Sequence, residues 1–136
     1  MPHGRGTLYC NGYKLYDGGW IEGHRDGIGV EFDVEENEEE EEDALLFKVY
    51  DGEWKQGLRH GKGTEFHKKS AIWKYSGDWV KSRRQGKGVE QDEKTNPIYE
   101  GEWVDDMRNG QGTCYFLGTN KKEYSGIWKS NLKNGR

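Results

Sequence analysis

The chain has 136 residues, of which 31% are hydrophobic, 34% are charged and 13% are aromatic, with a formal net charge of −4. Its length fits one domain, but the low hydrophobic share argues against a conventional globular core, and the lack of an 18-residue apolar run argues against a transmembrane helix. The apolar surface is concentrated in 6 tryptophans, 8 tyrosines and 4 phenylalanines. Because each ring can bury about 150–250 Å², we expect a thin structure held by an aromatic stripe.

The first predicted element covers residues 3–15, where a Gly-x-Gly pair at Gly4 is followed by a hairpin turn at Asn11-Gly12. The next element begins at Tyr16. There a tyrosine, a glycine and a tryptophan alternate, so their side chains share one face of an extended strand. A turn and a second Gly-x-Gly pair follow. Residues 3–15 therefore correspond to the back half of a separate, earlier copy of this unit, whose front half is missing.

This unit recurs along the chain, which marks a repeat architecture. Its starting tyrosines stand at 16, 50, 75, 99 and 124, so the spacings are 34, 25, 24 and 25 residues. Ser82 and Asp106 replace the turn glycine in two of the units. The repeated residues are Tyr16, Gly18, Trp20, Gly27, Gly29, Tyr50, Gly52, Trp54, Gly61, Gly63, Tyr75, Gly77, Trp79, Gly86, Gly88, Tyr99, Gly101, Trp103, Gly110, Gly112, Tyr124, Gly126 and Trp128.

These residues resemble the MORN repeat (membrane occupation and recognition nexus), and the resemblance covers nearly the whole chain outside the inserts between copies. It implies an all-β fold: an elongated, open-ended, single-layer array of stacked β-hairpins without a helix of note. We expect one array over residues 1–136, with a partial copy at 3–15, copies starting at 16, 50, 75 and 99, and a truncated copy from 124.

Each copy is expected to be a hairpin that stacks on its neighbours, because a lone two-stranded hairpin is marginal in water. The first strand would carry the tyrosine and tryptophan, with polar residues between them on a solvated face. The second strand would begin at the Gly-x-Gly pair, and Gly61 and Gly63 would make room for facing rings. His3 and His60 precede such pairs, so we expect them to serve in turns. Trp73, outside the repeat positions, is expected to pad the strand before Tyr75, or to anchor a partner.

Charge is unevenly distributed. Residues 31–53 carry a net charge of −11 and residues 55–90 a net charge of +7. The acidic block at 35–43 predicts a disordered loop between copies, which could fold over the basic region. The basic region suggests either an anion- or partner-binding surface or an ordinary solvated face. Its candidate contact residues are Lys68, Lys69, Trp73, Lys74, Lys81, Arg83, Arg84 and Lys87.

No catalytic, cofactor-binding or metal-binding residue is predicted. The Gly-x-Gly pairs lack the following helix that a phosphate-binding loop needs. The four histidines and two cysteines show no metal-ligand spacing. The two cysteines, Cys10 and Cys114, stand in different copies and suggest a reducing compartment. We therefore expect a non-enzymatic protein with no cofactor and no nucleic-acid ligand.

The resemblance implies three kinds of function. The first is a scaffold or adaptor for protein partners in a multi-protein cytoskeletal or ciliary assembly, similar to MORN arrays in radial spoke heads. The second is attachment to an anionic membrane lipid such as a phosphoinositide. The third is a regulatory segment of a larger enzyme. We expect a cytoplasmic, cytoskeleton-associated location, in the cilium or axoneme if the scaffold interpretation holds. Exposed strand edges also suggest end-to-end or edge association.

Overall fold

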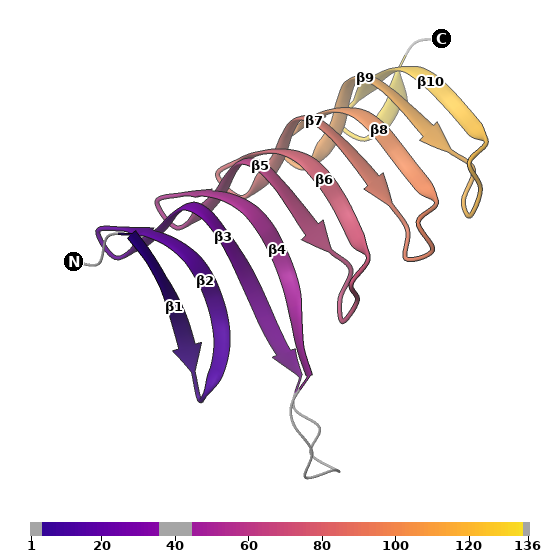
Figure 1. Cartoon of the computed structure of the whole chain (residues 1–136). Helices are drawn as coiled ribbons and strands as arrows, with labels where there is room; N and C mark the ends of the chain where they lie inside the picture. Colours follow the sequence, from indigo (N-terminus) through magenta and orange to yellow (C-terminus); the bar gives the residue numbers. More distant parts are fainter. Residues whose placement is uncertain (1–3, 36–44, 135–136) are drawn as a thin grey trace.

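The computed structural model describes residues 4–35 and 45–134, which form one antiparallel sheet of eleven strands in sequence order. The sheet is elongated and its strands are strongly curved, so it forms an arch (Figure 1). This confirms the all-β array of stacked hairpins. The strands are β1 (Gly4–Cys10), β2 (Tyr13–Ile21), β3 (His24–Glu35), β4 (Leu45–Lys55), β5 (Leu58–Phe66), β6 (Trp73–Val80), β7 (Arg83–Gln91), β8 (Pro97–Val104), β9 (Met107–Tyr115), β10 (Lys122–Lys129) and β11 (Leu132–Asn134).

The array has two long edges with different connections. Two-residue turns after each tryptophan-bearing strand line one of them, which we call the turn edge; they join β2 to β3, β4 to β5, β6 to β7, β8 to β9 and β10 to β11. The remaining connections line the other, which we call the loop edge. Of the predicted acidic loop at residues 35–43, only its first residue, Glu35, lies within the described residues.

The second strand of each hairpin starts earlier than the sequence suggested. In the copy that begins at Tyr50, β5 starts at Leu58, three residues before Gly61. The expectation that strand two begins at Gly-x-Gly is therefore wrong. The reason is the tight turn: Gln56 and Gly57 have φ angles of 51° and 83°, as a two-residue turn with matching twist requires.

Gly61 and Gly63 have different roles. A Cβ at Gly63 would collide with the hydroxyl and ring of Tyr50, so this glycine makes room for the ring as predicted. Gly61 does not: it has a φ of 75°, lies in a register irregularity of the ladder, and faces the carboxylate of Glu53. His60 lies beside it inside β5, so its expected turn role is also wrong; His3 lies outside the described residues.

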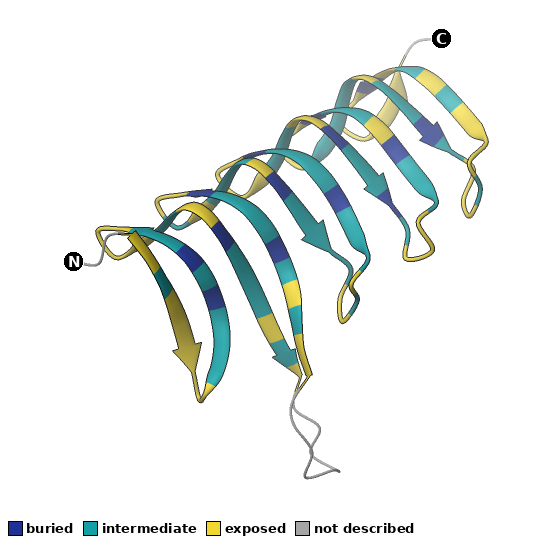
Figure 2. Cartoon of the chain, in the orientation of Figure 1, coloured by how far each residue is buried: buried dark blue, intermediate teal, exposed yellow. Residues whose placement is uncertain are grey.

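The core is a single file of rings. Four of the repeat tyrosines are fully buried, and four of the repeat tryptophans are at least 95% buried. Figure 2 shows that the buried positions recur at corresponding places on successive strands. Tyrosine and tryptophan alternate along the file with edge-to-face geometry, and their ring centroids lie 5.0 to 5.5 Å apart. Each tryptophan from Trp54 onward contacts a tyrosine of its own copy and one of the preceding copy, which joins the hairpins.

Candidate functional site

The repeat aromatics use their polar atoms within the sheet. Each indole N–H donates to a glycine carbonyl of the preceding copy, as Trp79 does to Gly63 at 3.0 Å. Each tyrosine hydroxyl donates to the carbonyl three residues later, as Tyr75 does to Asp78 at 3.0 Å. Burial raises the pKa of Tyr99 to about 12 and also raises the pKa values of the equivalent tyrosines, Tyr50 and Tyr75. These residues therefore build the scaffold, and a partner would meet the side chains that cover them.

A row of arginines covers the rings. The residue opposite each repeat tryptophan is Arg25, Arg59, Arg84 or Arg108, and Lys133 in the last copy. Each guanidinium carbon stacks over a tyrosine of its own copy and a tryptophan of the next; for Arg84 the distances to the ring centroids are 4.6 and 5.1 Å. Cation–π contacts of this kind favour the charged group even where water is largely excluded.

Glutamates alternate with these arginines and form an arginine–glutamate ladder. Arg59 places Nη2 3.1 Å from Glu31 and Nη1 3.5 Å from Glu65. Arg84 repeats this geometry, with Nη2 2.9 Å from Glu65 and Nη1 3.6 Å from Glu90. The Arg59 and Arg84 side chains are only 16% and 12% exposed. Because each carboxylate bridges two arginines, the ladder ties neighbouring copies together and neutralises most of its own charge.

The turn edge fixes the arginine backbones. The second turn residue of one copy reaches the arginine of the preceding copy: Asp106 N–H donates to Arg84 O at 3.0 Å, and Arg84 N–H donates to Asp106 Oδ1 at 2.8 Å. Ser82 and Asn131 make the same reciprocal pair with Arg59 and Arg108. These turn residues have positive φ angles, which glycine tolerates best, so the two hydrogen bonds offset backbone strain.

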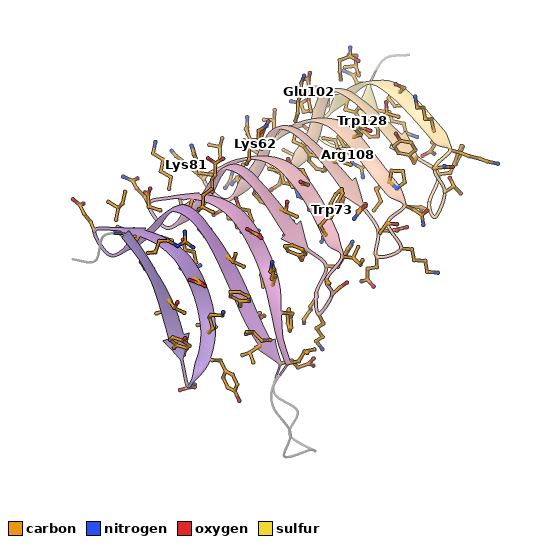
Figure 3. All side chains as sticks on the ribbon, viewed as in Figure 1. Lys62, Trp73, Lys81, Glu102, Arg108 and Trp128 are labelled. Carbon is orange, nitrogen blue, oxygen red and sulfur yellow. The ribbon has the colours of Figure 1, made fainter. Side chains whose placement is uncertain are left out.

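A second set of acids holds the opposite face. In three interior copies the carboxylate before the tryptophan accepts a hydrogen bond from the middle residue of Gly-x-Gly, from Lys62 N–H to Glu53, Lys87 N–H to Asp78, and Gln111 N–H to Glu102. Figure 3 shows Lys62 and Glu102 on the outer side of the arch, whereas Trp128 and Arg108 lie within it. The expectation that the polar residues between tyrosine and tryptophan only form a solvated face is thus incomplete. These acids also hold the pairing of the two strands in each hairpin.

The predicted basic residues do not gather on one surface. Lys68 and Lys69 lie in the connection on the loop edge and Lys74 in β6 near it, whereas Lys81 and Arg83 lie at the turn edge and Lys87 lies within β7. Lys69 pairs with Glu35, the described end of the acidic block, and Arg83 pairs with Asp105 at 3.9 Å. The inclusion of Arg84 as an exposed contact is wrong, because that side chain is held in the ladder.

Trp73 is part of the sheet. It is the first residue of β6, lies opposite Phe66 and is partly buried (Figure 3). Its carbonyl accepts a hydrogen bond of 2.8 Å from the side chain of Gln91, which is itself 7% exposed. Its location agrees with the padding role and leaves only part of the ring for a partner.

One surface had no counterpart among the predicted sites. The residues just before and after each tight turn point to the outer face, because they alternate with the buried tryptophans. Each of the five turns carries at least one exposed apolar side chain there, and we call this set the outer row. It consists of Ile21, Leu58, Val80, Val104 and Leu132, which are 47%, 42%, 40%, 37% and 71% exposed. The position after each tryptophan is apolar in three copies, a signal that could have been read from the sequence.

Three further observations concern the described residues. None of residues 4–35 and 45–134 belongs to a group of three or more metal-ligating side chains. Within the same ranges no helix is long and apolar enough to cross a membrane. Cys10 is exposed, whereas Cys114 is buried and its thiol has a raised pKa, first through burial and then through the nearby Glu123 carboxylate.

Comparison with known protein families identifies the repeat. The model of the family described as MORN repeat matches six segments: residues 1–12, 16–33, 50–68, 75–94, 99–116 and 124–136. These segments make up more than half of the chain. Comparison with curated proteins gave no significant match. The chain therefore belongs to the MORN-repeat family.

Proposed function

We propose that this MORN-repeat chain is a non-catalytic scaffold that binds protein partners along the outer row of its turn edge. The observation that carries the proposal is the recurrence of that row. Each of five consecutive hairpins carries an exposed apolar side chain directly before or directly after its tight turn, as Val80 and Val104 do. Two strands of about 4.8 Å separate equivalent positions, so the row repeats about every 10 Å along the array. A periodic apolar row suits an extended protein segment or a repetitive assembly.

The distribution of cations favours this proposal over attachment to an anionic membrane. A lipid surface attracts clustered lysines and arginines, but the basic residues of 55–90 are divided between the two edges, the middle of the strands and the arginine–glutamate ladder. Several of them also have acidic partners, such as Lys62 with Asp78 and Lys69 with Glu35. We place the chain in a multi-protein assembly of the cytoskeleton, with the cilium as the setting that the family resemblance suggests.

The test compares two matched double variants in a capture experiment from ciliated and non-ciliated cell extracts. Val80→Asp/Val104→Asp alters the outer row, and Leu45→Asp/Leu46→Asp adds the same charge to exposed apolar side chains at the loop edge. We expect the intact chain and the loop-edge variant to retain the same cytoskeletal partners, and the outer-row variant to lose them. Near-ultraviolet circular dichroism checks that the ring stack is intact. Equal retention by both variants would refute the proposed surface.

The membrane alternative is tested on vesicles containing phosphoinositide. The intact chain should stay in the supernatant at physiological salt, where exposed charges are screened over about 8 Å. Deleting residues 36–43 should leave this result unchanged if protein binding is the function. Sedimentation of the intact chain with these vesicles, lost on charge reversal of Lys81 and Arg83, would favour the membrane function instead.

A further inference from the structure

Two arginines of the arginine–glutamate ladder pair with a single carboxylate among the described residues: Arg25, in the first copy, and Arg108. Arg108 also lines a hollow. Arg59 and Arg84 each pair with two carboxylates: Nη2 faces the glutamate of the preceding copy and Nη1 faces the glutamate of the same copy. Arg108 keeps the first contact, with Nη2 3.2 Å from Glu90. No carboxylate among residues 4–35 and 45–134 makes the second, within ion-pair distance of Nη1.

The missing carboxylate follows from a single residue. Glu65 stands opposite Tyr50 and Glu90 stands opposite Tyr75, and the residue in the same register opposite Tyr99 is Cys114. The backbone and rings continue unchanged, since Trp128 still stacks on Tyr99 with a centroid distance of 5.3 Å. The Arg108 guanidinium therefore lies in its usual place while its partner is absent.

A hollow occupies the place next to this guanidinium. It has a volume of about 540 Å³ and is lined by Arg108, Cys114 and Lys133 together with the apolar side chains of Ile98, Leu117 and Leu132. Leu117 and Leu132 are 85% and 71% exposed, so the same hollow offers accessible apolar surface as well as a cation. The Arg108 side chain is 24% exposed, twice the value of Arg84.

Glu123 is the one described acid that lines this hollow, and it is engaged elsewhere. Its carboxylate lies 3.3 Å from Lys133 and accepts a hydrogen bond of 3.5 Å from the Cys114 thiol. Glu123 balances the charge of Lys133, so Nη1 of Arg108 has no carboxylate partner among the described residues. An incoming carboxylate would gain a charge-assisted hydrogen bond there, in a setting where the cation is already partly desolvated.

We infer that this hollow is a binding site for an acidic side chain of a protein partner, with a large apolar residue beside it. The carboxylate takes the place that Glu65 and Glu90 hold in the earlier copies, and the neighbouring apolar side chain packs on Leu117 and Leu132. The site deepens the proposed scaffold function by naming the chemistry of one partner contact. Its cationic part lies within the arch, and it shares only Leu132 with the outer row, whose other members lie at the turns of the preceding copies.

The probe is a short acetylated and amidated peptide, Leu-Glu-Leu, titrated into the intact chain and followed by nuclear magnetic resonance. The indole N–H of Trp128 and the Arg108 Nε–H should shift, while the indole of Trp79 in the closed part of the ladder should not. The matching Leu-Gln-Leu peptide should bind at least about tenfold more weakly, the factor expected for one charge-assisted hydrogen bond. Equal binding of the two peptides would overturn the inference.

Two variants of one residue make the test specific. Cys114→Glu supplies the missing carboxylate from within the chain and should abolish the peptide-induced shifts. Cys114→Ser leaves the position open and should retain them. Glu123→Gln removes a competing negative charge and should strengthen binding of the glutamate peptide. Undiminished binding to Cys114→Glu would show that the peptide sits elsewhere, and a shift with inorganic phosphate but not with the peptide would show a different ligand class.

The result separates this inference from the scaffold proposal. If the peptide fails to bind but the outer-row variant still loses its partners, the carboxylate site is wrong and the scaffold function stands. If the peptide binds and the outer-row variant keeps its partners, the site is correct and the proposed partner surface is wrong.

Discussion

Interior copies of the array and the copies at either end of the described chain share one backbone but differ in what closes around it. Trp79 stacks on two tyrosines, whereas Trp20 stacks on one. Arg84 lies between two carboxylates, whereas Arg25 in the first copy and Arg108 in the last copy but one have one each. The comparison teaches that the repeat signature specifies the hairpin and the ring, while the residues outside it decide which positions are closed and which are available to a partner.

The largest effect should come from removing a ring that joins two copies. Trp79→Ala deletes a 97% buried side chain, two edge-to-face contacts and the bond to Gly63, so it should cost about 3–5 kcal/mol of unfolding free energy. Trp20→Ala removes a partly buried ring with one such contact and should cost clearly less. Urea denaturation of both variants measures the difference, and equal costs would contradict the joining role of the interior rings.

A glycine comparison tests whether the tyrosine ring requires an absent side chain. Gly63→Ala would place a methyl group against the Tyr50 hydroxyl and should destabilise by about 3 kcal/mol, as overpacking does in a rigid site. Gly6 holds the equivalent position in the first hairpin, where an added Cβ would meet only the edge of Trp20 at 3.3 Å. Gly6→Ala should therefore cost less than about 1 kcal/mol, as thermal unfolding can verify.

The third comparison removes one arginine charge from the arginine–glutamate ladder, either at Arg84, which has two carboxylate partners, or at Arg108, which has one. Arg84→Gln leaves Glu65 and Glu90 with one cation fewer each and should cost about 2 kcal/mol. Arg108→Gln removes a cation from Glu90 alone, and the Arg108 side chain is more exposed than that of Arg84. The loss of unfolding free energy should therefore be about 1 kcal/mol. Chemical denaturation at low and high salt measures both. A larger loss for Arg108→Gln would mean that a second anion already engages that residue.

The sequence predicted the hairpin array, the shared face of tyrosine and tryptophan and the role of Gly63, because these follow from alternation and from a repeated spacing. It did not predict the ladder. Arg59 and Glu65 lie in one copy, but Glu31 lies on a strand of the preceding copy. Only the observed strand register brings Glu31 next to Arg59. The early start of β5 was missed because the sequence does not reveal that Gly61 occupies an irregularity within a strand.

The basic region shows a second limit of reading composition. A net charge of +7 over residues 55–90 suggested a common surface, yet strand alternation and the two edges separate its members. Lys69 lies at the loop edge and Lys81 at the turn edge, and Arg84 is held over the ring stack. Charge counted along a β-strand array predicts little about patches, because successive residues face opposite sides and successive strands reverse direction.

The smallest expected effect is a gain in stability at the turn of Gln56 and Gly57, the one interior turn of the described strands whose second residue is a glycine. Asp106 and Asn131 accept a hydrogen bond from an arginine N–H of the preceding copy, but Gly57 offers only its own N–H, to Arg25 O at 2.9 Å. Gly57→Asn supplies the missing acceptor, and asparagine tolerates the φ of 83° better than other residues. An added Cβ would make only an ordinary contact with His24, at 3.8 Å. We therefore expect a stabilisation of about 0.5 kcal/mol.

Gly57→Ala is the control, since it introduces the same Cβ without an acceptor and should destabilise. Differential scanning calorimetry distinguishes the two, and a lower melting temperature for Gly57→Asn than for the intact chain would show that the turn does not govern the arginine position.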